Sequence, residues 1–550
     1  MTRTRRDLWL FWLFALLILA TGLGLRDPWP ADEPRFALVA RQMVETGNWL
    51  FPHRGIELYS DKPPLFMWMQ AALLWLTGNL RIAFLLPSLL AALGTLWCVV
   101  DLGKRLWTPR VGVYAGWAVL LTIQFTWHAK KAQIDPVVVF WITLSCYGLL
   151  RHLWKGPDWR MWALAWAAAG LGTITKGVGV IALLMLIPAG IAALRGWPQV
   201  RVHARDPKFW LGPLAFIAAC GVWLVPMLVA ALGHGGAEYR AYVDDILLRQ
   251  TVTRYANSWI HEHPWWYFIE VALTNWLPTV LLLPWAIPAW RRRLRRRDPR
   301  YLLPLAWVLL VFVFFSIPVG KRDMYILPAL PMLALALAPL LPGILRKPGA
   351  QRLLLAFTAV FSLVALAAGI AMLTGDPAFE RKFMDGRDAH VAGGLTWMFV
   401  SAGGFGLGAC LWFGRRRAQI ALVAMLTMLW LLYSLIGAPL LNDGSSSRGL
   451  MRAVGQAIGP TAELGLVGWR EQQLLMADRP AANFGFKRDA ALQFADAVRW
   501  QRQRPLARWL LVEEAEGLPA CVDKPRARDM GIANGRRFWL MDATVTARCP

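Results

Sequence analysis

Residues 8–37 read LWLFWLFALLILATGLGL and then RDPWPADEPRFA. The first 18 letters are predominantly apolar, which is close to the roughly 20 residues that a helix needs to cross a bilayer. Arginines precede this run and no small-residue cleavage site stands out after it, so we expect a retained membrane span rather than a cleaved signal peptide. The polar stretch that follows then begins a loop on the far side of the membrane.

The composition of the whole chain is that of a membrane protein. Of its 550 residues 57% are hydrophobic and only 17% are charged, whereas a soluble domain carries about 25% charged residues. The net charge of +25 is also typical of nucleic-acid binders. Much of the excess, however, lies in short basic clusters between apolar runs, where it sets the membrane orientation. We therefore expect no nucleic-acid partner.

The number of apolar runs predicts the topology. If the N-terminal arginines are cytoplasmic, every short loop on that side is basic, as the positive-inside rule requires. An odd number of spans then places the end of the chain outside the cytoplasm. We predict a mostly α-helical polytopic protein with about thirteen transmembrane helices, near 8–25, 82–100, 111–127, 136–151, 161–174, 178–194, 209–231, 268–290, 302–317, 325–342, 353–374, 395–413 and 419–441.

The segment after the last apolar run has a different composition. We predict a transmembrane domain at 1–441 and a small soluble α/β domain at 442–550. Short apolar stretches typical of buried strands lie at 465–468, 509–512 and 538–541, and helical spacing is found at 490–500. Cys521 and Cys549 can pair if this domain faces an oxidising compartment.

Unusual polar residues gather in the loops on the outer side. The first outer loop, 26–81, contains PADEPRFA at 30–37 and LYSDKPPL at 58–65. Between them, helical spacing at 36–44 predicts a helix that lies on the membrane surface. A third element, FFSIPVGKRDMYILPALP, occupies 314–331 near a late span. Any chemistry is therefore expected on the outer face.

These three elements, in this order and topology, resemble the type C glycosyltransferases, which use polyprenyl-phosphate sugars. Within that class they are most similar to the family of bacterial undecaprenyl phosphate–aminoarabinose:lipid A transferases. The resemblance implies a multi-pass protein of the inner membrane with a small periplasmic C-terminal domain. It also implies transfer of 4-amino-4-deoxy-L-arabinose from undecaprenyl phosphate to a lipid A phosphate, with inversion, a modification that confers resistance to polymyxin. The expected partners are these two lipids and the surrounding membrane lipids, and we expect a monomer.

The chemistry implied by the resemblance needs cations near two phosphates, because both phosphates approach one anomeric carbon. Candidates for binding the carrier or acceptor phosphate are Lys62, Tyr59, Lys321, Tyr325, Arg254 and Lys176. A basic residue at a membrane interface has a simpler alternative, which is to extend towards water or lipid headgroups. For Lys176, which precedes a glycine, the alternative is a plain turn.

Carboxylates are expected to bind the ammonium group of the donor sugar or to orient the acceptor. Asp32 is the principal catalytic candidate, with Glu33 beside it and Asp135 as the second choice. Acidic residues also favour helix starts, so the Asp32-Glu33 pair can instead be a helix cap. The same alternative holds for Asp135, which a proline follows.

A divalent metal that bridges the carrier phosphate would fit the same electrostatics. Asp61 and His261 are the candidate ligands, although no ligand spacing of recognised zinc type is present. The alternative for His261 is a place beside the tryptophans of an interfacial aromatic belt.

Two other functions remain open from the sequence. A sister transferase would move another sugar, such as mannose, onto protein or another glycan, and Asp32 would then act as a base on a hydroxyl acceptor. A lipid transporter would need charged or broken segments at mid-membrane depth, whereas the conspicuous polar residues here lie in loops on one face. The sequence therefore favours an enzyme.

Overall fold

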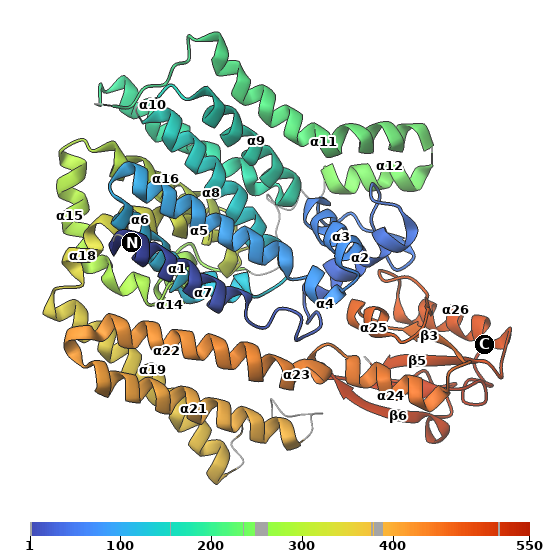
Figure 1. The fold of residues 1–550 in the computed structure, drawn as a ribbon. Helices are drawn as coiled ribbons and strands as arrows, with labels where there is room; N and C mark the ends of the chain where they lie inside the picture. Colours follow the sequence, from blue (N-terminus) through green and yellow to red (C-terminus); the bar gives the residue numbers. More distant parts are fainter. Residues whose placement is uncertain are drawn as a thin grey trace.

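The computed structural model describes residues 3–154, 156–197, 199–234, 236–247, 262–375, 378, 389–514 and 517–550. Long helices form the bulk of the molecule, and the C-terminal sheet lies at one end of them, next to α2, α3 and α4 (Figure 1). The helices before the sheet are α1 (Arg3–Ala20), α2 (Glu33–Thr46), α3 (Leu65–Thr77), α4 (Leu80–Ala83), α5 (Leu86–Leu106), α6 (Pro109–Leu120), α7 (Ile123–Ala129), α8 (Ile134–Leu153), α9 (Trp159–Lys176), α10 (Leu186–Leu194), α11 (Leu211–His234), α12 (Ala237–Asp244), α14 (Tyr267–Asn275), α15 (Leu283–Arg295), α16 (Pro299–Ser316), α17 (Ala329–Leu337), α18 (Leu341–Ile344), α19 (Pro348–Thr374), α21 (Ala389–Phe413), α22 (Ala418–Leu432) and α23 (Ala438–Ser445).

The number of spans differs from the prediction. Within the described residues, 7 helices are long and apolar enough to cross a membrane, or up to 8 if the bent pair of α14 and α15 is one span. The expected thirteen are not reached, because several apolar runs are short or interrupted. The run at 111–127 is divided between α6 and α7, and the run at 325–342 yields only the shorter apolar helix Ala329–Ile344. Helix α1 carries Arg3, Arg5, Arg6 and Asp7 in its first turns, which leaves less apolar length.

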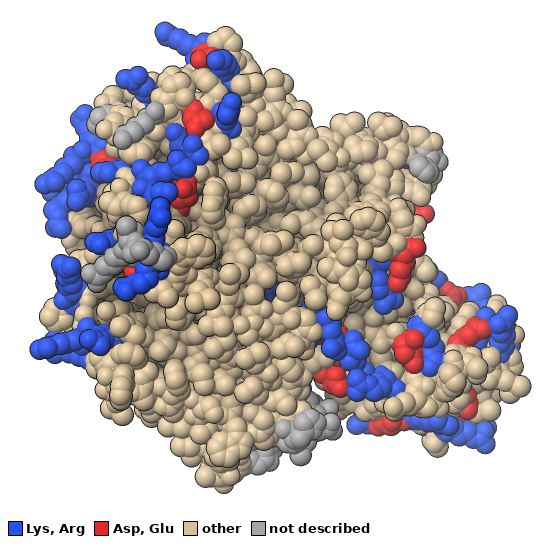
Figure 2. Space-filling model, viewed as in Figure 1, with Lys and Arg blue, Asp and Glu red and all other residues tan. Residues whose placement is uncertain are grey.

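The distribution of charge agrees with a membrane-spanning bundle. Lys and Arg side chains gather along the edge where α10, α15 and α18 lie, while the opposite edge mixes basic and acidic residues (Figure 2). The face between the two edges is nearly free of charged side chains. Helix α15 ends on the basic edge with Arg292, Arg293 and Arg295. The C-terminal sheet lies at the end of the bundle away from this basic edge.

The C-terminal segment folds into a five-stranded mixed sheet with the strand order β4-β3-β5-β7-β6. Strand β3 pairs in parallel with β4 and β5, and β7 pairs antiparallel with β5 and β6. The strands and helices are α24 (Arg448–Ile458), β3 (Glu463–Val467), α25 (Glu471–Met476), β4 (Ala481–Asn483), α26 (Ala490–Arg502), β5 (Arg508–Glu514), β6 (Arg528–Ala533) and β7 (Arg536–Met541). The predicted strands, the predicted helix and the pairing of Cys521 with Cys549 are confirmed. The boundary at 441/442 stays a prediction, and α23 runs across it.

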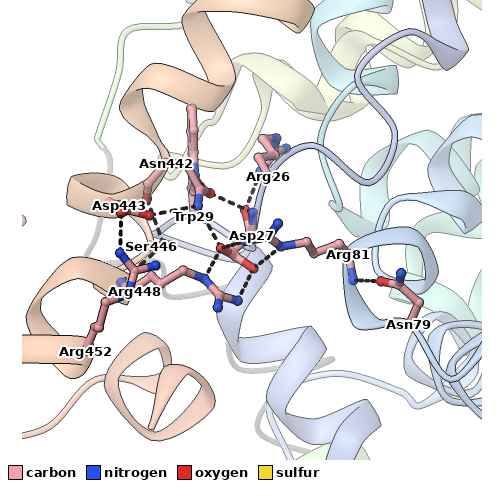
Figure 3. A network of polar contacts seen from close by, with 10 residues as sticks. All are labelled: Arg26, Asp27, Trp29, Asn79, Arg81, Asn442, Asp443, Ser446, Arg448 and Arg452. Carbon is pink, nitrogen blue, oxygen red and sulfur yellow. Dashed lines mark hydrogen bonds and ion pairs between the residues drawn. The ribbon is translucent and has the colours of Figure 1, made fainter. Parts of the chain in front are cut away.

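A buried carboxylate fastens this C-terminal domain to the membrane helices (Figure 3). The Asp27 side chain is only 1% exposed and accepts hydrogen bonds from Arg448 at 2.5 and 2.6 Å and from Arg81 at 2.8 and 3.0 Å. Asn442 donates to the same carboxylate at 2.7 Å and accepts from the Asp27 backbone N–H at 2.7 Å. The end of the first span, α4, α23 and α24 therefore meet at one residue. We call these four residues the Asp27 cluster.

The Asp27 cluster makes the docking of the domain depend on pH. Burial alone would raise the pKa of Asp27, but the hydrogen bonds from Arg448, Arg81 and Asn442 lower it from the ordinary 3.8 to about 2. A carboxylate with a depressed pKa stabilises the folded protein above its unfolded pKa, and this contribution is lost as the pH falls through the folded pKa.

Replacing Asp27 should therefore destabilise the protein at neutral pH. For Asp27→Asn we expect a loss of about 2 kcal/mol of unfolding free energy, which corresponds to the difference between 3.8 and about 2. The deficit should shrink as the pH is lowered from about 4 towards 2. Thermal unfolding of the detergent-solubilised protein over this pH range measures both effects. Asp443→Asn is the control, because Asp443 is 52% exposed in its ion pair with Arg452. Equal melting temperatures for the two variants at pH 7 would contradict the role of the cluster.

Candidate active site

The two acidic residues of the first motif have different surroundings, and Glu33 is the buried one. Its carboxylate accepts two hydrogen bonds from Arg26, at 2.5 and 2.7 Å. It also accepts from the backbone N–H groups of Trp29 at 2.8 Å and Ala132 at 2.9 Å. Four donors occupy the acceptor positions that a carboxylate offers. Glu33 thus ties the end of the first span to the loop before α8.

Asp32 stands at the N-cap position of α2, but its side chain accepts no capping hydrogen bond. The Asp32 carboxylate therefore does not cap helix α2. It lies instead between two arginines, 3.6 Å from Arg35 and 3.8 Å from Arg322, and remains 19% exposed. Since Arg322 belongs to the third motif, the first and third motifs meet at Asp32.

Asp135, Lys176 and Tyr325 converge from three separate segments. Lys176, the last residue of α9, forms an ion pair with Asp135, and its ammonium nitrogen lies 5.2 Å from the ring centroid of Tyr325. The N-cap of α8 is Gln133, so the expectation that Asp135 caps this helix is wrong. Gly177 does form the predicted turn, with a φ of 70° that favours glycine. The turn directs Lys176 to a carboxylate rather than to solvent.

The second motif follows a short hairpin of β1 (His53–Arg54) and β2 (Glu57–Leu58). Tyr59 is 1% exposed, and its hydroxyl has no hydrogen-bond partner among the described residues. Burial, together with the nearby Asp61, raises the pKa of Tyr59. A buried polar group without a partner is uncommon and is often found where a ligand binds. Asp61 lies 3.4 Å from Arg54, and Lys62 follows it directly.

The remaining predicted residues are not brought into one group. Lys321 is buried and donates from its ammonium group to the backbone oxygen of His263 at 2.9 Å, and burial lowers its pKa. Arg254 and His261 lie outside the described residues. Within the described ranges no three His, Cys, Asp or Glu side chains are grouped to hold a metal ion. Asp61 faces cations instead, so its neighbours do not fit a metal site, and the divalent metal stays a prediction.

Sequence reasoning missed the residues that connect the motifs. Arg35 and Arg54 both contact Glu471 of the C-terminal domain, at 3.0 and 3.5 Å. Arg26 and the adjacent Asp27 also had no assigned role. A charged pair directly after an 18-residue apolar run is a usable signal for a buried ion pair, but the partners of such a pair lie up to 421 residues away.

His128 is another site residue that had no predicted role. Its Nδ1 is hydrogen-bonded to Gln133 at 2.7 Å, while Nε2 has no partner among the described residues. Burial lowers the pKa of His128 against the opposing effect of Asp135. A neutral imidazole therefore lies close to the pair formed by Asp135 and Lys176.

The chain is similar in sequence to known glycosyltransferases. Residues 61–225 match the family model of dolichyl-phosphate-mannose-protein mannosyltransferases. An undecaprenyl phosphate-α-4-amino-4-deoxy-L-arabinose arabinosyl transferase of Pectobacterium carotovorum is 30% identical over 379 residues, which is 66% of this chain and 64% of the relative. The enzyme of the same name from Erwinia tasmaniensis is 27% identical over 541 residues, or 94% and 93% of the two chains. The chain therefore spans slightly less than two thirds of the length of the Pectobacterium relative.

The fold agrees with this similarity. The crystal structure of ArnT from Cupriavidus metallidurans bound to undecaprenyl phosphate superposes with a TM-score of 0.73 over 98% of both chains, at 17% identity. The helical bundle and the C-terminal sheet of this chain therefore share the fold of that structure. In sequence the chain is similar to these arabinosyl transferases over 66% to 94% of its length.

The contrast between Glu33 and Asp32 can be tested directly. Glu33→Gln should destabilise the protein, because it leaves the buried Arg26 without its counter-charge, a change that typically costs about 3–5 kcal/mol. Asp32→Asn should leave stability within about 1 kcal/mol, since Arg35 and Arg322 are 28% and 37% exposed. The melting temperatures of the two purified variants decide the question. Similar melting temperatures would show that Glu33 does not have this structural role.

Proposed function

We propose that this chain transfers 4-amino-4-deoxy-L-arabinose from undecaprenyl phosphate to a phosphate of lipid A at the periplasmic face of the inner membrane. The observation that carries the proposal is the contact of the first motif with the third, where Asp32 faces Arg322. Two further carboxylates also face cations: Asp61 of the second motif faces Arg54, and Asp135 faces Lys176. Similarity to arabinosyl transferases that are named for this sugar and carrier supports the choice of both.

The reaction is a displacement at the anomeric carbon. An oxygen of the lipid A phosphate forms a bond to this carbon while the bond to the carrier phosphate breaks, and undecaprenyl phosphate leaves with the electron pair. A single displacement inverts the configuration. The acceptor phosphate is already ionised, so the step needs stabilisation of negative charge more than it needs a base.

The charged pairs in the site suit this task. The ammonium group of Lys176 can bind an approaching phosphate while it stays paired with Asp135. The ring of Tyr325 lies beside the same ammonium group. Lys62 and the unpartnered hydroxyl of Tyr59 are our candidates for the carrier phosphate, with Lys321 and Arg254 as further candidates. Asp32 is positioned to bind the sugar ammonium or to orient the acceptor. Glu33 holds the loop in place, because all its acceptor positions are already occupied.

The consequence for the cell follows from charge. An added amino sugar brings a positive group to a lipid A phosphate, so the outer surface binds cationic peptides such as polymyxin less tightly. The basic edge of the bundle and the disulfide between Cys521 and Cys549 support a periplasmic location for the C-terminal domain, because disulfides persist in oxidising compartments. We propose that the enzyme acts as a monomer.

A second candidate function is supported by the family model that matches residues 61–225, whose description is a mannosyltransferase acting on protein. In that case the acceptor is a hydroxyl group and Asp32 takes its proton. The two candidates differ in acceptor and in sugar, so one product analysis separates them.

Product analysis should identify lipid A that carries aminoarabinose. A Gram-negative strain that makes the donor but lacks its own transferase is complemented with the parent chain, and lipid A is examined by mass spectrometry. We expect the parent and Asp443→Asn to add the sugar and Asp32→Asn to reduce the addition at least about 100-fold, as for loss of a charged group in the transition state. Unmodified lipid A in cells with well-expressed parent protein would refute the proposal and favour the mannosyl alternative.

Loss of Lys62 should weaken binding of the carrier. For Lys62→Ala we expect the Kd for undecaprenyl phosphate to rise about tenfold, because one charge-assisted contact to a phosphate is worth roughly 1.5 kcal/mol. Quenching of tryptophan fluorescence in the purified protein measures this affinity. Lys524→Ala is the matched control, since Lys524 is 54% exposed and pairs with Glu514 in the C-terminal domain. An unchanged Kd would remove Lys62 from the phosphate site.

A further inference from the structure

Five charged side chains from three segments form a line of alternating sign. Asp32 is 3.6 Å from Arg35, whose Nε is 3.0 Å from Oε1 of Glu471. The same Oε1 lies 3.5 Å from Arg54, and Arg54 lies 3.4 Å from Asp61. We call this line the Glu471 bridge. It joins a carboxylate of the first motif to a carboxylate of the second motif through a residue of the C-terminal domain.

Burial along the bridge is greatest at Glu471 and Arg54, while Arg35 is 28% exposed. The side chains of Glu471 and Arg54 are each 5% exposed, whereas those of Asp32 and Asp61, at the two ends, are 19% and 25% exposed. A buried carboxylate between two arginines fixes their position strongly, because an unpaired charge at such a place is costly. The geometry is that of a rigid centre that holds two accessible carboxylates.

The C-terminal domain also holds the backbone of the hairpin that leads into the second motif. The N–H of Lys487 donates to Glu57 at 3.2 Å, and the N–H of Ile56 donates to Asn483 at 3.3 Å. At Gly55, where φ is 66°, any Cβ would lie 2.6 Å from the side-chain oxygen of Asn483, so only glycine permits this approach. The guanidinium carbon of Arg54 lies 3.8 Å from the ring centroid of Phe486. The hairpin is therefore packed on the domain.

We propose that Glu471 is a positioning residue for the transfer reaction, which through Arg35 and Arg54 sets the orientation of Asp32 and Asp61. The C-terminal domain is then a part of the active site and not a separate module. The proposal rests on the proposed function only in assuming that these two carboxylates face the substrates. A misplacement of about 1 Å at a reacting group lowers the rate about 100-fold, so loss of the bridge has a measurable effect.

The test uses the full-length protein with Glu471→Gln, which keeps the shape of the side chain and removes its charge. We expect kcat for transfer of the sugar to lipid A to fall between about tenfold and 100-fold. The Kd for undecaprenyl phosphate should change less than about twofold, because Lys62 is retained. Glu463→Gln is the control, since Glu463 forms surface ion pairs with Arg504 and Arg508 in the same domain.

A second readout does not depend on activity. Hydrogen–deuterium exchange of peptides covering 33–46 and 53–62 should be faster in Glu471→Gln than in the parent and unchanged in Glu463→Gln. Parent protein that fails to modify lipid A would refute the proposed function alone, and the exchange data would still decide the role of Glu471. Full activity of Glu471→Gln, or unchanged exchange in both peptides, would overturn the inference.

Coupling between the arms of the bridge gives a stricter test. Arg35→Gln removes one arm of the bridge. We expect the double variant of Arg35→Gln and Glu471→Gln to lose less kcat than the product of the two single losses, because both substitutions break the same ion pair. If Glu471→Gln does not accumulate, Arg35→Gln alone carries the test, since Arg35 is 28% exposed. Effects that multiply independently, or a fully active Arg35→Gln, would contradict the bridge.

Discussion

The buried ion pair between Arg26 and Glu33 is the interaction on which the outer face of the protein depends. Both side chains lie where an isolated charge is unfavourable, so each needs the other, and the pair fixes how the chain leaves the first span. The next residue, Asp27, carries the opposite charge and makes its contacts with α4, α23 and α24. Two adjacent residues thus tie the end of one helix both to the loop before α8 and to the C-terminal domain. The motifs around the candidate site lie between these two attachments.

The difference between Asp32 and Glu33 follows from helix geometry. Adjacent residues at a helix start project about 100° apart, so one side chain can lie in the protein interior while its neighbour faces the outside. The side chain of Glu33 points into the interior, where Arg26 and two backbone N–H groups donate hydrogen bonds to it. Asp32 takes the outer direction, towards Arg322. A motif of two identical charges therefore supplies one carboxylate that is fully paired in the interior and one that stays partly exposed.

The sequence predicted the parts of the structure that depend on local pattern. Apolar runs became helices, three of the five strands of the C-terminal sheet were predicted near their true positions, and helix α2 formed where helical spacing predicted it. Among the described residues fewer helices have spanning length than the thirteen spans predicted, because apolar content at 111–127 does not reveal the break between α6 and α7. Of the candidate site, the sequence singled out Asp32, Asp135, Lys176 and Tyr325, each of which has a charged neighbour in the structure. It did not indicate Glu471 or Arg54, since the partners of a buried charge are chosen by tertiary packing and lie hundreds of residues apart.

The glycine at position 55 and the alternating charges beside it bear on how such proteins can diversify. A C-terminal domain that docks through a close backbone approach, a shared carboxylate and the Asp27 cluster cannot be exchanged for that of a relative as an independent cassette. Recombination between two homologues inside α23 would separate Asp27 from Arg448 and Arg35 from Glu471 in one event. Unless both parents carry the same partners, the hybrid inherits unpaired buried charge. We therefore expect the membrane helices and the C-terminal domain to be inherited together, without recombination between them.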